Sequence, residues 1–180
     1  MRMDIKTFIE QNLDENKRRL YRTLRGLTPE ELIWQPGPEC NPIGLIVWHM
    51  ARVEDRWLCH FAHDHRPELW IRDGWAQRLG LPEGDTGVGY TAEQVAQFQM
   101  PPLDEVQGYF DAVREEMLTY LRDLDPGELD VAPQRSPFPE IGSLPDDFTI
   151  GRMFRQLIGE YNQHLGQVSY LRGMQRGLNQ

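Results

Sequence analysis

Four long amphipathic segments constrain the fold of this chain more than any other feature of its sequence. Apolar residues recur at helical spacing over about residues 4–25, 41–62 and 103–124, and again from residue 149 onward. Gly26 ends the first segment and Asp125-Pro126-Gly127 ends the third, and no alternating strand pattern of comparable length competes. A helix with one apolar face must bury that face, so the sequence predicts an all-α fold, a four-helix bundle.

Capping signals predict where helices begin, including short extra helices in the connections. Thr28-Pro29-Glu30-Glu31 combines a capping threonine, a first-turn proline and a reciprocal glutamate, which predicts a short helix through Trp34. Thr91 with Gln94 predicts another short helix. Asn41-Pro42 and Thr149 are expected to start the second and fourth long helices.

Length and charge limit the class of protein. A chain of 180 residues suits one domain, 1–180, with a sizeable core. With 28 acidic against 19 basic residues the formal net charge is −9, so we expect no nucleic-acid partner. Cys40 and Cys59 are too few for a disulfide framework, which suits a reducing compartment. No signal-peptide order or membrane-length apolar run appears, so a cytoplasmic protein without a membrane partner is expected.

Three polar residues lie on the apolar stripes of two predicted helices. Glu160 and His164 are four positions apart, so they project from one helix face one turn apart, and His49 lies on another stripe. Two imidazoles and a carboxylate make a three-ligand metal site with room for water or substrate. Two alternatives remain open: His49 is a hydrogen-bonded core histidine, or Glu160 is neutralised by Arg52 or Arg56.

Other residues are candidates for supporting roles. Tyr161 and Gln167 lie near the Glu160/His164 pair and are candidates to contact a ligand side chain or the substrate. Arg52 is a candidate to hold an anionic substrate or else a surface arginine, and Trp57 is an aromatic platform or a core residue. The histidines His60, His63 and His65 form a second possible metal set or a solvated helix end. Segment 128–148 is proline-rich, without a regular period, and could line or cover a site.

Two segments resemble the DinB/YfiT-like metalloprotein superfamily. Residues 41–57, NPIGLIVWHMARVEDRW, resemble its second helix, in which His49 matches a ligand histidine. Residues 160–173, EYNQHLGQVSYLRG, resemble its fourth helix, with Glu160, His164, Gly166 and the pair Leu171-Arg172 in the hallmark positions. Many members carry histidine where this chain has Glu160, and the glutamate resembles the branch that includes the metal domain of mycothiol-dependent maleylpyruvate isomerase.

The resemblance implies a divalent ion, commonly zinc or nickel, with iron or manganese as further candidates, held by His49, Glu160 and His164. It also implies thiol-linked transferase or isomerase chemistry on a small-molecule substrate with a low-molecular-weight bacterial thiol, and a homodimer. Two other functions stay open: a metal-dependent hydrolase, and a non-catalytic, stress-linked binding protein in which the three residues form a buried polar network.

Overall fold

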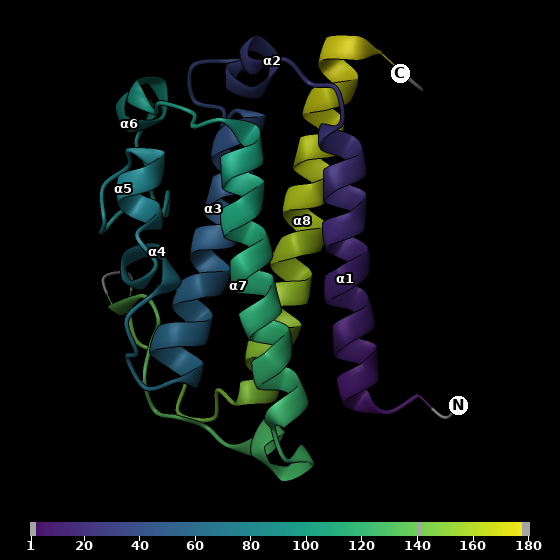
Figure 1. Cartoon of the computed structure of the whole chain (residues 1–180), viewed down its shortest axis with the longest axis vertical. Helices are drawn as coiled ribbons and strands as arrows, with labels where there is room; N and C mark the ends of the chain where they lie inside the picture. Colours follow the sequence, from purple (N-terminus) through teal and green to yellow (C-terminus); the bar gives the residue numbers. More distant parts are fainter. Residues whose placement is uncertain (1–2, 140–141, 178–180) are drawn as a thin grey trace.

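The four apolar stripes form the four long helices of a bundle in the computed structural model, which describes residues 3–139 and 142–177 (Figure 1). These helices are α1 (Ile5–Leu24), α3 (Ile43–Arg56), α7 (Leu103–Asp123) and α8 (Ile150–Arg176). Within the described ranges all regular elements are helical, so the predicted all-α fold class is confirmed. None of the helices in these ranges is long and apolar enough to cross a membrane.

Most helices begin where their capping residues predict. The Thr28 hydroxyl and the Glu31 carboxylate form a capping box at α2 (Pro29–Ile33), and Thr91 with Gln94 does the same at α6 (Ala92–Gln97). The Thr149 hydroxyl accepts a hydrogen bond from the Arg152 amide at the start of α8. The prediction for Asn41 was wrong: Pro42 is the capping residue of α3 and makes no side-chain cap.

The long helices form a ring in which α1 and α3 each pack against both α7 and α8. Figure 1 shows α1 and α8 running upward and α3 and α7 running downward, so two pairs of neighbours are parallel. A parallel pair such as α3 and α7 needs a connection that returns along the whole bundle. Residues 57–102 make this connection and contain α4 (Leu69–Arg72), α5 (Trp75–Leu79) and α6.

The second long segment changes its helical type before it ends. The α-helix stops at Arg56, and η1 (Trp57–Ala62) continues it as a π-helix. The amide of His63 therefore donates to the carbonyl of Leu58, five residues back, at 2.9 Å. This wider turn corrects the prediction of a single helix over 41–62.

A buried ion pair crosses the core of the bundle and was not predicted. The Glu54 carboxylate of α3 accepts two hydrogen bonds from Arg114 of α7, at 2.8 and 2.9 Å, and both side chains are almost fully buried. The Tyr161 hydroxyl of α8 donates to Glu54, and Arg114 also donates to the Leu13 carbonyl of α1. One polar cluster therefore links all four long helices.

The connection from α7 to α8 is longer than the fold requires. Both helix ends lie at the bottom of the bundle in Figure 1, so a few residues would join them. After η2 (Pro126–Asp130) the chain instead makes an excursion, and a 2.9 Å hydrogen bond from the Ile150 amide to the Val131 carbonyl closes its base. Segment 131–148, which we call the strap, is irregular over its described residues 131–139 and 142–148.

Candidate metal centre

His49, Glu160 and His164 lie together between α3 and α8. The His164 Nε2 atom is 3.4 Å from a Glu160 carboxylate oxygen, and the rings of His49 and His164 meet edge to face with centroids 5.2 Å apart. Packing of α3 on α8 therefore brings His49 to the Glu160/His164 pair, which lies more than a hundred positions further along the sequence. The spacing argument predicted their shared location but not their local partners.

Each histidine has an oxygen acceptor at its Nδ1 atom. The His49 Nδ1 is 2.7 Å from the backbone carbonyl of Thr86, and the His164 Nδ1 is 2.8 Å from the side-chain carbonyl of Gln167. A carbonyl oxygen only accepts, so in the neutral rings Nδ1 carries the proton and Nε2 keeps its lone pair. Metal-ligating imidazoles are held in the same way in proteins. Gln167, a candidate from the sequence to contact a ligand side chain, thus contacts the candidate ligand His164.

Burial and charge set the ionisation of the three side chains. Burial, the largest effect, lowers the pKa of His49, so this ring is neutral at pH 7. The hydrogen bond with His164 is the main cause that lowers the pKa of Glu160, which is therefore ionised. Burial opposes protonation of His164, but hydrogen bonds to Glu160 and Gln167 outweigh it and its pKa is raised.

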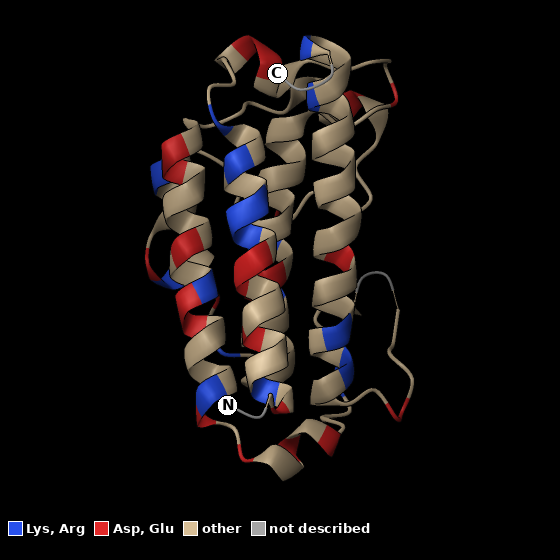
Figure 2. Cartoon of the chain, turned by 90° about the vertical axis from the view of Figure 1, so that its right-hand side faces the viewer, with Lys and Arg blue, Asp and Glu red and all other residues tan. Residues whose placement is uncertain are grey.

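Glu160 is the only acidic residue of α8, and the arginines of this helix lie towards its two ends. Figure 2 shows this pattern on the helix at the right, with one red band between blue bands. The amide of Gln156 donates to Oε1 of Glu160 at 2.8 Å and holds the carboxylate from the preceding turn. No arginine neutralises Glu160 in the described structure, so this alternative from the sequence does not apply.

A glycine-rich loop supplies the carbonyl that holds His49. Gly87 has φ +76, and a Cβ there would lie 3.2 Å from the Trp48 ring and 3.3 Å from the His49 Nδ1 atom. Only glycine combines this backbone conformation with so close an approach. A glycine cluster in a sequence predicts positive φ but not the partner of a neighbouring carbonyl, so the sequence did not indicate this contact.

A cavity of about 560 Å³ opens beside the three residues. The strap forms one wall of it, as the sequence allowed for segment 128–148, and Trp57 forms part of another and stacks on Phe148 at 5.4 Å. The described lining consists of the three candidate ligands with apolar, glycine and uncharged polar residues: Asn41, Val53, Trp57, Gly87, Val88, Gly89, Ser136, Phe138, Gly142, Ser143, Leu144, Phe148 and Gln156.

Arg52 and Tyr161 have partners outside this cavity. Arg52 is fully buried, 2.6 Å from Glu68, and it donates to the Tyr109 hydroxyl at 3.0 Å. It therefore does not hold a substrate beside His49, in contrast to the prediction. The Tyr161 hydroxyl is directed to Glu54 in the core, so this residue packs behind the three candidate ligands rather than presenting its hydroxyl to the cavity.

The histidines that follow α3 do not converge on one point. The two Nδ1 atoms of His60 and His65 are 3.3 Å apart, and His60 Nε2 lies 2.8 Å from Glu68. His63 packs against the ring of Tyr120 instead. In the part of the chain that the structure describes, no three histidine, cysteine or acidic side chains are positioned to hold a metal ion as they stand. His49, Glu160 and His164 supply suitable donor atoms, two imidazole nitrogens and a carboxylate, but they do not converge on one point in this structure.

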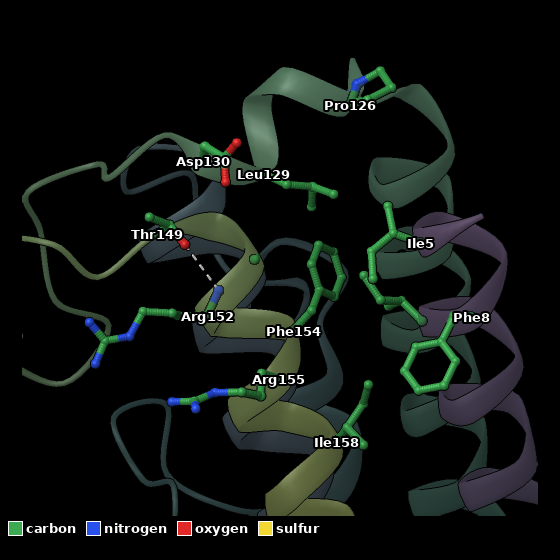
Figure 3. A pocket seen from close by; sticks show the side chains of 12 residues that line it. Ile5, Phe8, Pro126, Leu129, Asp130, Thr149, Arg152, Phe154, Arg155 and Ile158 are labelled. Atoms are coloured by element: carbon green, nitrogen blue, oxygen red, sulfur yellow. Dashed lines mark hydrogen bonds between the residues drawn. The ribbon is translucent and has the colours of Figure 1, made fainter.

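A larger hollow, of about 820 Å³, lies between the start of α1, η2 and the start of α8. Figure 3 shows Ile5, Phe8 and Phe154 around it, while the side chains of Arg152 and Arg155 extend to the other side of α8. Its described lining contains no histidine or cysteine. Size alone therefore does not identify the reactive site, and the cavity at the histidines is the candidate.

The family of the chain follows from a match over most of its length. The family model of the DinB superfamily matches residues 12–168, and the chain belongs to this superfamily. The crystal structure of a conserved protein from Enterococcus faecalis has a TM-score of 0.78 at 22% sequence identity, over 96% of this chain and 98% of that chain. This likeness shows the shared fold alone. Among curated proteins none matches the chain.

Proposed function

We propose that this protein binds one divalent metal ion, zinc or nickel first among the candidates, through His49, Glu160 and His164, and that it is a metal-dependent enzyme. The observation that carries the proposal is the pair of Nδ1 contacts to Thr86 and Gln167, which leaves the Nε2 atoms as the metal-binding atoms. At His164 the metal would replace the proton that Nε2 shares with Glu160.

The donor set supports a catalytic rather than a structural ion. Two imidazoles and one carboxylate leave a coordination position open, and the neighbouring cavity of about 560 Å³ has room for a small molecule. The neutral His49 and the ionised Glu160 are in the protonation states that ligands require. The ligand helices α3 and α8 pack directly on each other and give the site a rigid base.

The proposed reaction class is a thiol-linked transfer or isomerisation, as the family resemblance implies. A bound divalent cation stabilises a thiolate relative to its thiol. The protein's own thiols are not suited to this role: burial raises the pKa of Cys59 to about 12, and Cys40 is not among the described lining residues. The reacting thiol would therefore come from a cosubstrate held in the cavity.

Elemental analysis of protein purified without a histidine tag or chelator tests the proposal. Wild type is expected to carry about one equivalent of metal, and His49→Ala and His164→Ala are expected to lose it. His63→Ala is the matched control, because His63 lies against Tyr120 and away from the cavity, and it should keep the metal. Circular dichroism establishes that each variant is folded.

The results separate the alternatives. Metal retained by both ligand variants contradicts the assignment of the site. Folded wild type that binds no added zinc or nickel favours the non-catalytic binding protein. If metal-loaded protein hydrolyses esters, amides or lactams without any thiol, the hydrolase replaces the thiol-linked enzyme.

A further inference from the structure

The cavity at the histidines has few charged side chains in its wall. Its described lining contains no lysine or arginine, and Glu160 is its only acidic residue. The polar groups that remain are the neutral side chains of Asn41, Ser136, Ser143 and Gln156. A carboxylate or phosphate on an occupant would lose water here without gaining a protein cation.

The arginines near this wall are held by other groups. Arg52 pairs with Glu68, and Arg56, which lies over the Phe138 ring at 4.9 Å, is 3.8 Å from the same carboxylate. Arg135 of the strap donates to the carbonyls of Phe61 and Ala62 at 2.6 and 3.1 Å. Arg152 pairs with Asp147 at 2.6 Å and so has a carboxylate partner as well. A rotation of one of these side chains into the cavity would break its present contacts, so none of them is a ready partner for an anion.

Aromatic side chains form the apolar part of the wall. Trp57 stacks on Phe148 with ring planes 18° apart and meets Phe138 edge to face at 6.1 Å. All three rings are buried and come from two separate segments, η1 and the strap. Rings fixed in this way bind flat apolar groups well, since little side-chain entropy is lost on contact.

We propose that the occupant of this cavity presents one metal-binding atom to His49, Glu160 and His164 and otherwise consists of an uncharged, flat, largely apolar body. Molecules that carry a carboxylate or phosphate on this body are rejected. The metal-binding atom rests on the proposed function, whereas the selection against charge rests on the wall of the cavity. The proposal thus narrows the substrate or thiol cosubstrate to one chemical class.

Two matched thiols test the selection. 4-Methylbenzenethiol and 4-mercaptobenzoate share the thiol and the ring and differ in the distal group. Isothermal titration of zinc-loaded protein is expected to give at least about tenfold tighter binding of the methyl compound. The same order, with weaker binding of both compounds, is expected for chelator-treated protein, because the wall does not depend on the ion.

Variants locate the selection in the cavity. Ser143 is exposed and lines the cavity, so Ser143→Lys adds a cation there and should tighten binding of 4-mercaptobenzoate about tenfold. Ser169→Lys, at an exposed position of α8 that does not line the cavity, is the matched control and should change neither affinity. Phe138→Ala should weaken the methyl compound by removing part of the aromatic wall.

Equal or tighter binding of 4-mercaptobenzoate by wild type, or no binding of either thiol, overturns the inference. Metal content measured on the same samples decides the proposed function separately. Protein that binds no metal but still prefers the methyl compound contradicts the metal centre and supports the selection against charge.

Discussion

The position of His49 depends on a backbone carbonyl that lies 37 residues further along the chain. Gly87 directly follows the residue that supplies this carbonyl, and its φ of +76 allows the loop to pass against the imidazole. The candidate centre therefore depends on a residue that has no side chain of its own to contribute.

Gly87→Ala is expected to lower metal content, because the new Cβ would press on the His49 Nδ1 atom and displace the Thr86 carbonyl. Gly89→Ala is a close control: its φ is +68, so the backbone strain is similar, but a Cβ there has nothing within 4 Å. Both variants should lose stability by about 1 kcal/mol in thermal unfolding. Equal metal content in the two variants would show that the loop does not position His49.

The Gln167 side chain plays the corresponding part for His164. Gln167→Leu removes the acceptor at 2.8 Å and should weaken metal affinity by about 10 to 100-fold, measured by competition with a chromogenic chelator. Gln163→Leu, at an exposed position one residue before His164, controls for the loss of a surface amide. Unchanged affinity in Gln167→Leu would remove the main support for the metal centre.

Among the elements, α3, α7 and α8 are joined by the buried cluster of Glu54, Arg114 and Tyr161. Arg114→Met leaves the Glu54 carboxylate buried without its cation and should destabilise the protein by about 3 to 5 kcal/mol in urea unfolding. The double variant Glu54→Leu with Arg114→Met should be more stable than Arg114→Met alone, since it removes the unpaired charge. If the double variant loses as much free energy of unfolding as the two single variants added together, this explanation is contradicted.

The start of α2 is joined to the end of α8 by an ion pair that gives a pH-dependent contribution. The hydrogen bond from Arg176 is the main cause that lowers the pKa of Glu31 from 4.5 to about 2. A lowered folded-state pKa means that the stabilisation is complete above about pH 4.5 and is lost as the pH falls towards 2.

Glu31→Gln tests this contribution without removing the helix cap, because glutamine also completes a capping box. The free energy of unfolding of the variant should fall below that of wild type at pH 7, and the difference should disappear between pH 4.5 and 2. Chemical denaturation at several pH values measures it. A difference that is constant over this range would assign the effect to the cap rather than to the charge.

Helices with a clear apolar period were predictable, and contacts made by loops were not. The stripes and caps predicted α1, α2 and α7 within a few residues of their observed bounds, and the starts of α6 and α8. The π-helix η1 was not predicted, because its residues continue the apolar pattern of α3. Arg52 was a candidate for substrate binding or a surface position, and neither applies, because its partner Glu68 lies in a connection whose path no periodicity encodes.

For the candidate site too, the residues on helices were predictable and the contacts made by loops were not. The four-residue spacing on α8 and the stripe of α3 predicted that His49, Glu160 and His164 lie close together, as they do. The acceptor Thr86 and the strap residues of the cavity wall come from irregular segments, so their roles depend on tertiary packing.

At the scale of the whole molecule, the strap adds a wall to a bundle that would be complete without it. Arg135 fixes it to the end of η1, where the carbonyls of Phe61 and Ala62 have no helical partner. Arg135→Ala should therefore speed proteolytic cleavage within residues 132–147 while helical circular dichroism stays unchanged. Arg155→Ala changes an exposed residue of α8 and is the control; this variant should be cleaved at the wild-type rate. Equal cleavage of both variants would show that aromatic packing alone holds the strap.

The order of the helices along the chain has a consequence during translation. α8 is the latest of the four long helices to be synthesised, yet it packs on both α1 and α3 and carries Glu160 and His164. At about 5 to 20 residues per second, its 27 residues take roughly one to five seconds to emerge. Throughout this interval the nascent chain exposes apolar helix faces that α8 later covers. Closure of the bundle, and with it any loading of the proposed centre, therefore has to follow the synthesis of α8.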